Sequence, residues 1–194
     1  MNTSIKKLVY SAVIGAVYAA LTMLLTPISY GPLQLRISEL LCILPFFFPA
    51  AAGGLAVGCV IANTMSTAGV LDIVFGSLAS LLAALCTAAA GIRARRRMAS
   101  AGEDEIIKNG ESRKKPGLWG ECIAACAMPV LFNAPIIGAV LSFTLTRDEF
   151  WAGFAVFALQ VGAGEAIVMF VMGLPLLRYL LKIDAVKEFF AALS

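Results

Sequence analysis

The chain has 194 residues, of which 60% are hydrophobic and 14% are charged, and its formal net charge is +3. With a mean hydropathy of +0.90, this composition excludes an ordinary water-soluble domain and predicts an integral membrane protein, with a single domain over residues 1–194. The absence of histidine and the placement of five cysteines in apolar stretches favour neither a metal site nor a disulfide framework. The basic residues gather in three short segments, which is an orientation signal and argues against a nucleic-acid partner.

In chain order, the first apolar run predicts a membrane span over residues 8–26. The next uncharged run, Leu40 to Leu71, has 32 residues and would form a helix about 48 Å long, which is too long for one crossing. Pro45 and Pro49 offer a break within it, because proline interrupts the hydrogen bonding of a helix. The region therefore predicts two spans, one of them short, over residues 36–48 and 50–66.

Three longer spans are predicted after this pair, over residues 72–92, 120–143 and 151–177. The hydrophilic stretch 93–117 separates the first two of them and contains eight Lys or Arg residues and four acids. Mixed charge of this kind is typical of a flexible, solvated connection. The predicted fold is an all-α integral membrane protein, a six-helix transmembrane bundle whose second and third spans are short or broken.

The basic residues predict the orientation of this bundle. With six spans and a cytoplasmic N-terminus, 13 of the 15 Lys and Arg residues lie on the cytoplasmic side, as the positive-inside rule requires. The loop 93–117 and both termini are then cytoplasmic. A single crossing by residues 40–71 would place the basic loop outside, so six spans are preferred over five.

A few charged or amide side chains remain in the predicted spans, where a charge costs at least about 2.5 kcal/mol. Arg36, Glu39, Asn63 and Asp72 lie near the outer surface. Structural alternatives stay open, because Arg36 and Glu39 at i and i+3 can form an ion pair and Asp72 can cap its own helix. Three acids, counting Glu165, against one base favour a cationic or donor-rich ligand.

Asn133, Gln160 and Glu165 lie deeper, about 14 to 21 Å from the outer ends of their helices. Gln160 and Glu165 are five residues apart, about 140° around the helix, so both cannot face one small pocket. Asn133 and Gln160 can instead serve as interhelical hydrogen-bond partners. Glu165 has no Lys or Arg within a helical turn, which favours a functional role for this acid.

The first span carries Ala12, Ala16 and Ala20 at intervals of four residues, a smooth ridge that another protein's helix can approach closely. Packing within the chain is the alternative. The sequence contains no G-x-x-x-x-G-K-[ST] phosphate loop and no evident inverted repeat, so transport would need energy from another protein. We predict no catalytic residue, no metal site and no enzyme, since no nucleophile has an evident base beside it.

Three segments resemble the queuosine-precursor transporters, which are substrate-binding (S) components of energy-coupling-factor (ECF) importers. They are residues 30–39 (YGPLQLRISE), 61–63 (IAN) and 72–78 (DIVFGSL). The likeness extends over nearly the whole chain, and the ridge of the first span matches the alanine motif of this family. The resemblance implies a multi-pass protein of a prokaryotic plasma membrane that binds its ligand outside the cell.

The resemblance also implies partners: a transmembrane coupling (T) subunit and two cytoplasmic ATPase subunits. It implies that the alanine ridge contacts the coupling subunit, that ATP is used by the partners, and that this chain binds no cofactor. The implied ligand is a 7-deazaguanine such as queuine or its aminomethyl precursor. A carboxylate can accept both the ring N–H and the exocyclic amine of such a base, while a second carboxylate suits a protonated amine.

The predicted substrate-binding residues combine the polar groups with aromatic side chains that can stack on a ring. They are Tyr30, Arg36, Glu39, Asn63, Asp72, Phe75, Asn133, Gln160 and Glu165, with Phe132 as a further aromatic candidate. The sequence does not assign one acid to one ligand group. Two other readings stay open, namely an S component for another vitamin such as thiamine and a membrane protein without a transport function.

Overall fold

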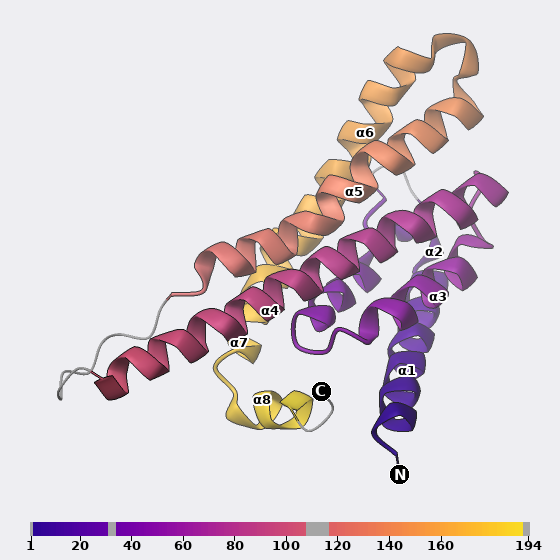
Figure 1. Ribbon diagram of the computed structural model, residues 1–194. Coiled ribbons are helices and arrows are strands. Elements are labelled where there is room, and N and C mark those ends of the chain that lie inside the picture. Colours follow the sequence, from indigo (N-terminus) through magenta and orange to yellow (C-terminus); the bar gives the residue numbers. More distant parts are fainter. Residues whose placement is uncertain (1, 31–33, 108–116, 192–194) are drawn as a thin grey trace.

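The computed structural model describes residues 2–30, 34–107 and 117–191, which form helices and contain no strand (Figure 1). The first half contains α1, α2, a 3₁₀ helix, α3, a π-helical segment and α4. In that order, the bounds are Thr3–Leu24 for α1, Thr26–Ser29 for α2, Ile37–Phe46 for the 3₁₀ helix, Ala51–Asn63 for α3, Asp72–Gly76 for the π-helical segment and Ser77–Ile107 for α4. The second half contains α5, a 3₁₀ turn, α6, a second π-helical segment, α7 and α8. In that order, the bounds are Trp119–Leu145 for α5, Arg147–Glu149 for the 3₁₀ turn, Phe150–Ala166 for α6, Ile167–Gly173 for the second π-helical segment, Leu174–Leu180 for α7 and Asp184–Ala191 for α8.

Four of the described helical stretches are long and apolar enough to cross a membrane. They are Thr3–Leu24, Asp72–Ser100, Trp119–Leu145 and Arg147–Leu180. The 3₁₀ helix and α3 are also apolar but have only 10 and 13 residues, which gives each a length of about 20 Å. A bilayer core is about 30 Å thick. The chain is thus an all-helical, multi-pass membrane protein, while the count of six crossings and the cytoplasmic termini stay predictions.

The predicted interruption of the second apolar run is confirmed. The 3₁₀ helix ends at Phe46 and α3 begins at Ala51. Pro45 lies in the last turn of the 3₁₀ helix and Pro49 lies in the connection, where the absence of an N–H prevents a continuous α-helix. The two short helices therefore form a hairpin in place of one long rod.

The prediction of a flexible connection over residues 93–117 is wrong in its first part, because α4 continues to Ile107. Two contacts fix this helical extension. Arg95 donates from Nη1 to the carbonyl oxygen of Phe46 at 2.8 Å, and Arg97 forms an ion pair with Glu121 in the first turn of α5. Charged side chains thus extend the helix beyond the apolar span, and the remainder of the predicted loop, 108–116, lies outside the described residues.

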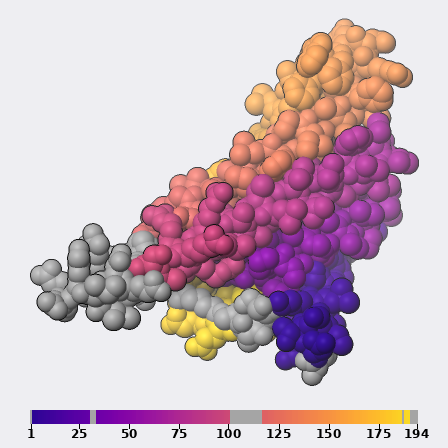
Figure 2. Space-filling model, in the orientation of Figure 1, coloured from indigo at the N-terminus to yellow at the C-terminus, as the bar shows by residue number. Residues whose placement is uncertain are grey.

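The long helices α4, α5 and α6 run side by side, and α1 and α3 pack against each other on the other side of α4 (Figure 1). The hairpin of α5 and α6 projects beyond the rest of the molecule at one end (Figure 2). At the opposite end α8 lies beside α1, since the rings of Phe189 and Tyr10 are 5.5 Å apart. This arrangement places the 3₁₀ helix in the interior, between α1, α4 and the second π-helical segment.

Candidate functional site

The polar site begins where the chain enters the 3₁₀ helix. Gln34 has a φ of 45°, in the left-handed region that a residue with a side chain adopts at a cost of about 1 kcal/mol or more. The backbone N–H of Arg36 then donates to the carbonyl oxygen of Gln34 at 2.9 Å. This turn directs Arg36 into the protein, where only 5% of the residue is exposed.

Arg36 faces Asp72 at the start of the first π-helical segment, with 3.6 Å between Nη2 and Oδ2. The guanidinium also lies over the ring of Tyr30, at 4.9 Å from its centroid. Arg36 Nε and Nη2 and Asp72 Oδ1 are buried and have no hydrogen-bond partner in the described part of the chain. Buried polar atoms of this kind are costly unless a water or ligand completes them. They therefore provide donors and an acceptor for a polar ligand.

Tyr30 and Asn63 connect α2, α3 and the π-helical segment around this pair. The Tyr30 hydroxyl donates to the Ala62 carbonyl oxygen at 2.7 Å, and Asn63 Nδ2 donates to the backbone oxygen of Asp72 at 2.9 Å. Asn63 is completely buried. Its amide holds the end of α3 against the start of the first π-helical segment, so it positions Asp72 in addition to being a candidate ligand contact.

Glu39 lies one turn after Arg36 and is completely buried. Tyr18 of α1 donates its hydroxyl to Glu39 Oε1 at 2.5 Å, and the Cys42 thiol donates to Oε2 at 2.9 Å. The described ion pairs do not include Arg36 with Glu39, since the base pairs with Asp72 instead. Both oxygens of Glu39 are thus held by donors from the protein itself.

Glu165 approaches the same region from α6 and is 2% exposed. Asn133 of α5 donates from Nδ2 to Glu165 Oε1 at 2.5 Å, so two of the three residues that the sequence places deeper in the spans form a pair. Glu39 and Arg36 are close enough to act electrostatically on Glu165. The second π-helical segment begins two residues later, at Ile167, and π-helical turns are frequent at functional sites.

Gln160 lies in a separate place, as its angular separation from Glu165 predicts. It lines a pocket of about 250 Å³ together with Tyr30, Gln34 and Thr67 and with apolar residues of α5 and α6. Tyr30 contributes both to this pocket and to the surroundings of Arg36. The pocket therefore adjoins the buried polar cluster through the tyrosine ring.

Phe75 is the predicted site residue that lies apart from the polar cluster. It is 45% exposed and lines an apolar groove that Phe143 of α5 and Phe154 of α6 also line. The side chain three residues after Asp72 thus faces away from Arg36. The structure brings the other predicted residues into the polar cluster or the adjoining pocket, and Phe132, the further aromatic candidate, is partly buried on α5.

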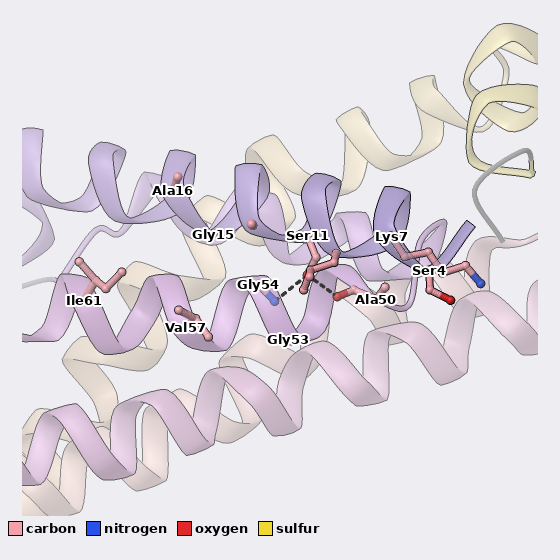
Figure 3. A pocket seen from close by; sticks show the side chains of 12 residues that line it. Ser4, Lys7, Ser11, Gly15, Ala16, Ala50, Gly53, Gly54, Val57 and Ile61 are labelled. Atoms are coloured by element: carbon pink, nitrogen blue, oxygen red, sulfur yellow. Dashed lines mark hydrogen bonds between the residues drawn. The ribbon is translucent and has the colours of Figure 1, made fainter. Parts of the chain in front are cut away.

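Ala12 and Ala16 line a groove of about 640 Å³ between α1 and α3, opposite Gly53 and Val57 (Figure 3). Ala20 is exposed on α1 but does not line this groove. At its floor the two helices touch through their backbones.

That close approach depends on Ser11 and Gly54. A Cβ atom on Gly54 would overlap the carbonyl oxygen of Ser11, so only glycine allows the backbones this near. The Ser11 hydroxyl donates to Ala50 O at 2.7 Å and accepts from the N–H of Gly54 at 3.0 Å (Figure 3). The alanine surface is thus one wall of a groove whose other wall is α3.

Sequence reasoning missed Tyr18, Cys42 and Gln34. A signal for Tyr18 exists, because a tyrosine in the middle of a helix of small apolar residues must find a partner for its hydroxyl inside the protein. No comparable signal marks Gln34, whose role follows from backbone conformation. The sequence around Cys42 was misleading, because a cysteine in an apolar run is usually a packing residue, whereas this thiol donates to Glu39.

Two comparisons with known proteins bear on this chain. A family model described as "QueT transporter" matches residues 8–182. A region of 73 residues is 40% identical to the queuosine precursor transporter QueT of Lactococcus lactis subsp. cremoris (strain MG1363), and it covers 37% of this chain and 43% of that relative. The matched region thus spans less than half of the relative. No solved structure matches the chain.

Proposed function

Because the chain belongs to the QueT transporter family, whose members are transporters and not enzymes, we propose that it captures a queuosine precursor outside the cell for import. The relative from Lactococcus carries that substrate in its name. In this proposal the chain is the S component of an ATP-driven ECF importer in a prokaryotic plasma membrane. Its ligand is a 7-deazaguanine such as queuine or the aminomethyl precursor.

The observation that carries the proposal is the buried, incompletely bonded pair of Arg36 and Asp72. A 7-deazaguanine presents a carbonyl oxygen beside ring and exocyclic N–H groups. Arg36 Nε and Nη2 can donate to the oxygen, while Asp72 Oδ1 can accept from an N–H, which would complete all three unpartnered atoms. The ring of Tyr30, already beneath the guanidinium, provides an aromatic surface at the entrance.

The groove between α1 and α3 supports the second half of the proposal. The chain has no phosphate loop of its own, so ATP-driven import requires separate subunits. Ala12 and Ala16 offer a surface without bulky side chains, which a helix of a transmembrane coupling subunit can approach closely. Two cytoplasmic ATPases would act through that subunit, and the chain itself would bind no cofactor.

Titration calorimetry on the full chain in detergent, with queuine, the aminomethyl precursor and thiamine, tests the ligand. We expect binding of at least one deazaguanine and none of thiamine. Arg36→Lys should lower the affinity for the deazaguanine by roughly tenfold or more, because lysine lacks the planar fork of donors. Arg147→Lys, at an exposed residue of the turn before α6, serves as the control. Binding of thiamine alone would overturn the assignment.

A further inference from the structure

The buried polar cluster contains more acids than bases. The exposed fraction is 5% for Arg36, 0% for Glu39, 2% for Asp72 and 2% for Glu165. If all three acids were ionised, the cluster would carry two uncompensated negative charges. Charges removed from water without a partner cost several kcal/mol each, and more inside a membrane.

The contacts identify which acid lacks compensation. Asp72 faces Arg36. Glu39 accepts hydrogen bonds on both oxygens, from Tyr18 and Cys42, the arrangement that stabilises an ionised carboxylate.

Glu165 differs from both, because its hydrogen-bond partner in the described part of the chain is the neutral amide of Asn133. The charged and titratable groups near it are Arg36, directly before the 3₁₀ helix, and Glu39 and Cys42 within that helix. Helix α5 contributes Asn133. The nearby Glu39 repels a second negative charge, and Arg36 is already engaged by Asp72. A proton on Glu165 removes this repulsion.

From this geometry we propose that Glu165 carries a proton in the empty site and loses it to solvent when the ammonium group of the ligand takes its place. This inference rests on the proposed function, since it requires a deazaguanine with a protonated side-chain amine. The charges balance, because one positive charge enters the cluster and one proton leaves it. The chain would therefore discriminate amine-bearing from neutral deazaguanines according to pH.

Calorimetry in buffers of different ionisation enthalpy counts the protons released on binding. The probes are aminomethyl-7-deazaguanine and the same ring without the amine. We expect about one proton released per amine ligand and none per neutral ligand. While Glu165 is protonated in the empty site, the affinity for the amine ligand should increase as the pH is raised, by up to about tenfold per pH unit. The affinity for the neutral ring should not rise with pH.

Glu165→Gln should bind the amine ligand without releasing a proton, since the glutamine can still accept a hydrogen bond from Asn133. Glu121→Gln, where the acid pairs with Arg97 away from the cluster, is the control and should keep the release of about one proton. Release by Glu165→Gln equal to that of the unmodified chain overturns the inference.

The two ligands also test the inference on the unmodified chain, should Glu165→Gln fail to fold. Binding of the amine without proton release overturns the inference alone. If neither deazaguanine binds, the proposed function fails and the inference fails with it.

Discussion

Opposite faces of α1 contribute to two different surfaces, the buried polar cluster and the groove with α3. Tyr18 and Thr22 face the interior, where both form hydrogen bonds to buried polar groups, whereas Ala12 and Ala16 line the open groove with α3. Ala16 and Tyr18 are two residues apart, about 200° around the helix. One surface is buried and rich in directed donors and acceptors, as recognition of a small polar ligand requires. The other is open and made of small residues, as close helix packing requires.

Ala16→Leu should have the largest effect of the changes that separate these surfaces. The added side chain fills the groove and holds any docking helix away, so uptake by cells with the complete importer should fall to background. Ligand binding by the isolated chain should stay within about twofold, because the polar cluster lies on the other face of α1. Uptake of labelled queuine and calorimetry measure the two effects.

Val13→Phe is the matched control for that variant, since Val13 is an exposed residue of α1 that does not line the groove. Its uptake should remain normal. Normal uptake by Ala16→Leu would show that the groove is not the docking surface. Lost ligand binding would show that the two faces of α1 are not independent.

Asp72→Ala tests the buried surface and should be the next largest change. It leaves Arg36 buried without a counter-ion, which destabilises a folded protein by about 3–5 kcal/mol. Thermal unfolding in detergent should show the loss. The double variant Arg36→Met with Asp72→Leu should recover stability while ligand binding stays lost, because the charge pair is then absent altogether. Retained binding in the double variant would contradict the assignment of the pair to the ligand.

Tyr18→Phe should have a smaller effect on stability, about 1–3 kcal/mol, because Glu39 Oε1 loses its donor while the ring still packs. Uptake should fall only in proportion to ligand binding, in contrast to Ala16→Leu on the opposite face. Thermal unfolding, calorimetry and uptake measured together distinguish the two. A selective loss of uptake would place Tyr18 in partner contact.

Most of the helical segments could be predicted from the sequence, because apolar runs of membrane length and proline breaks leave few alternatives. The length of α4 could not. Its extension beyond Arg93 is rich in charged residues and resembles a solvated loop. The contacts at the start of this extension, from Arg95 to Phe46 and from Arg97 to Glu121, join segments far apart in the chain. Local composition does not predict contacts between segments that are far apart in the sequence.

The site shows the same division. Charged residues in apolar spans identified Arg36, Asp72 and Glu165 because each is expensive there. The pairing of Arg36 with Asp72 was not predictable, because it depends on the left-handed turn at Gln34 and on the π-helical segment that begins at Asp72. Phe75 was predicted as an aromatic side chain that could stack on the ligand ring, but the helix directs it to the apolar groove.

The 3₁₀ helix leads from the polar cluster toward α3, and Arg95→Met tests how firmly its C-terminal end must be held. Arg95 donates to the carbonyl oxygen of Phe46, and one turn earlier Gly91 lies so near that oxygen that a Cβ atom would overlap it. Loss of this hydrogen bond should reduce stability by about 1 kcal/mol. Arg96→Met, at an exposed residue of the same helix, should change stability by less. Arg36 and Glu39 lie at the N-terminal end of the 3₁₀ helix and Phe46 at its C-terminal end, so a weaker hold on Phe46 should also lower ligand affinity slightly. An unchanged affinity at reduced stability would show that the site is positioned from the N-terminal end of the 3₁₀ helix alone.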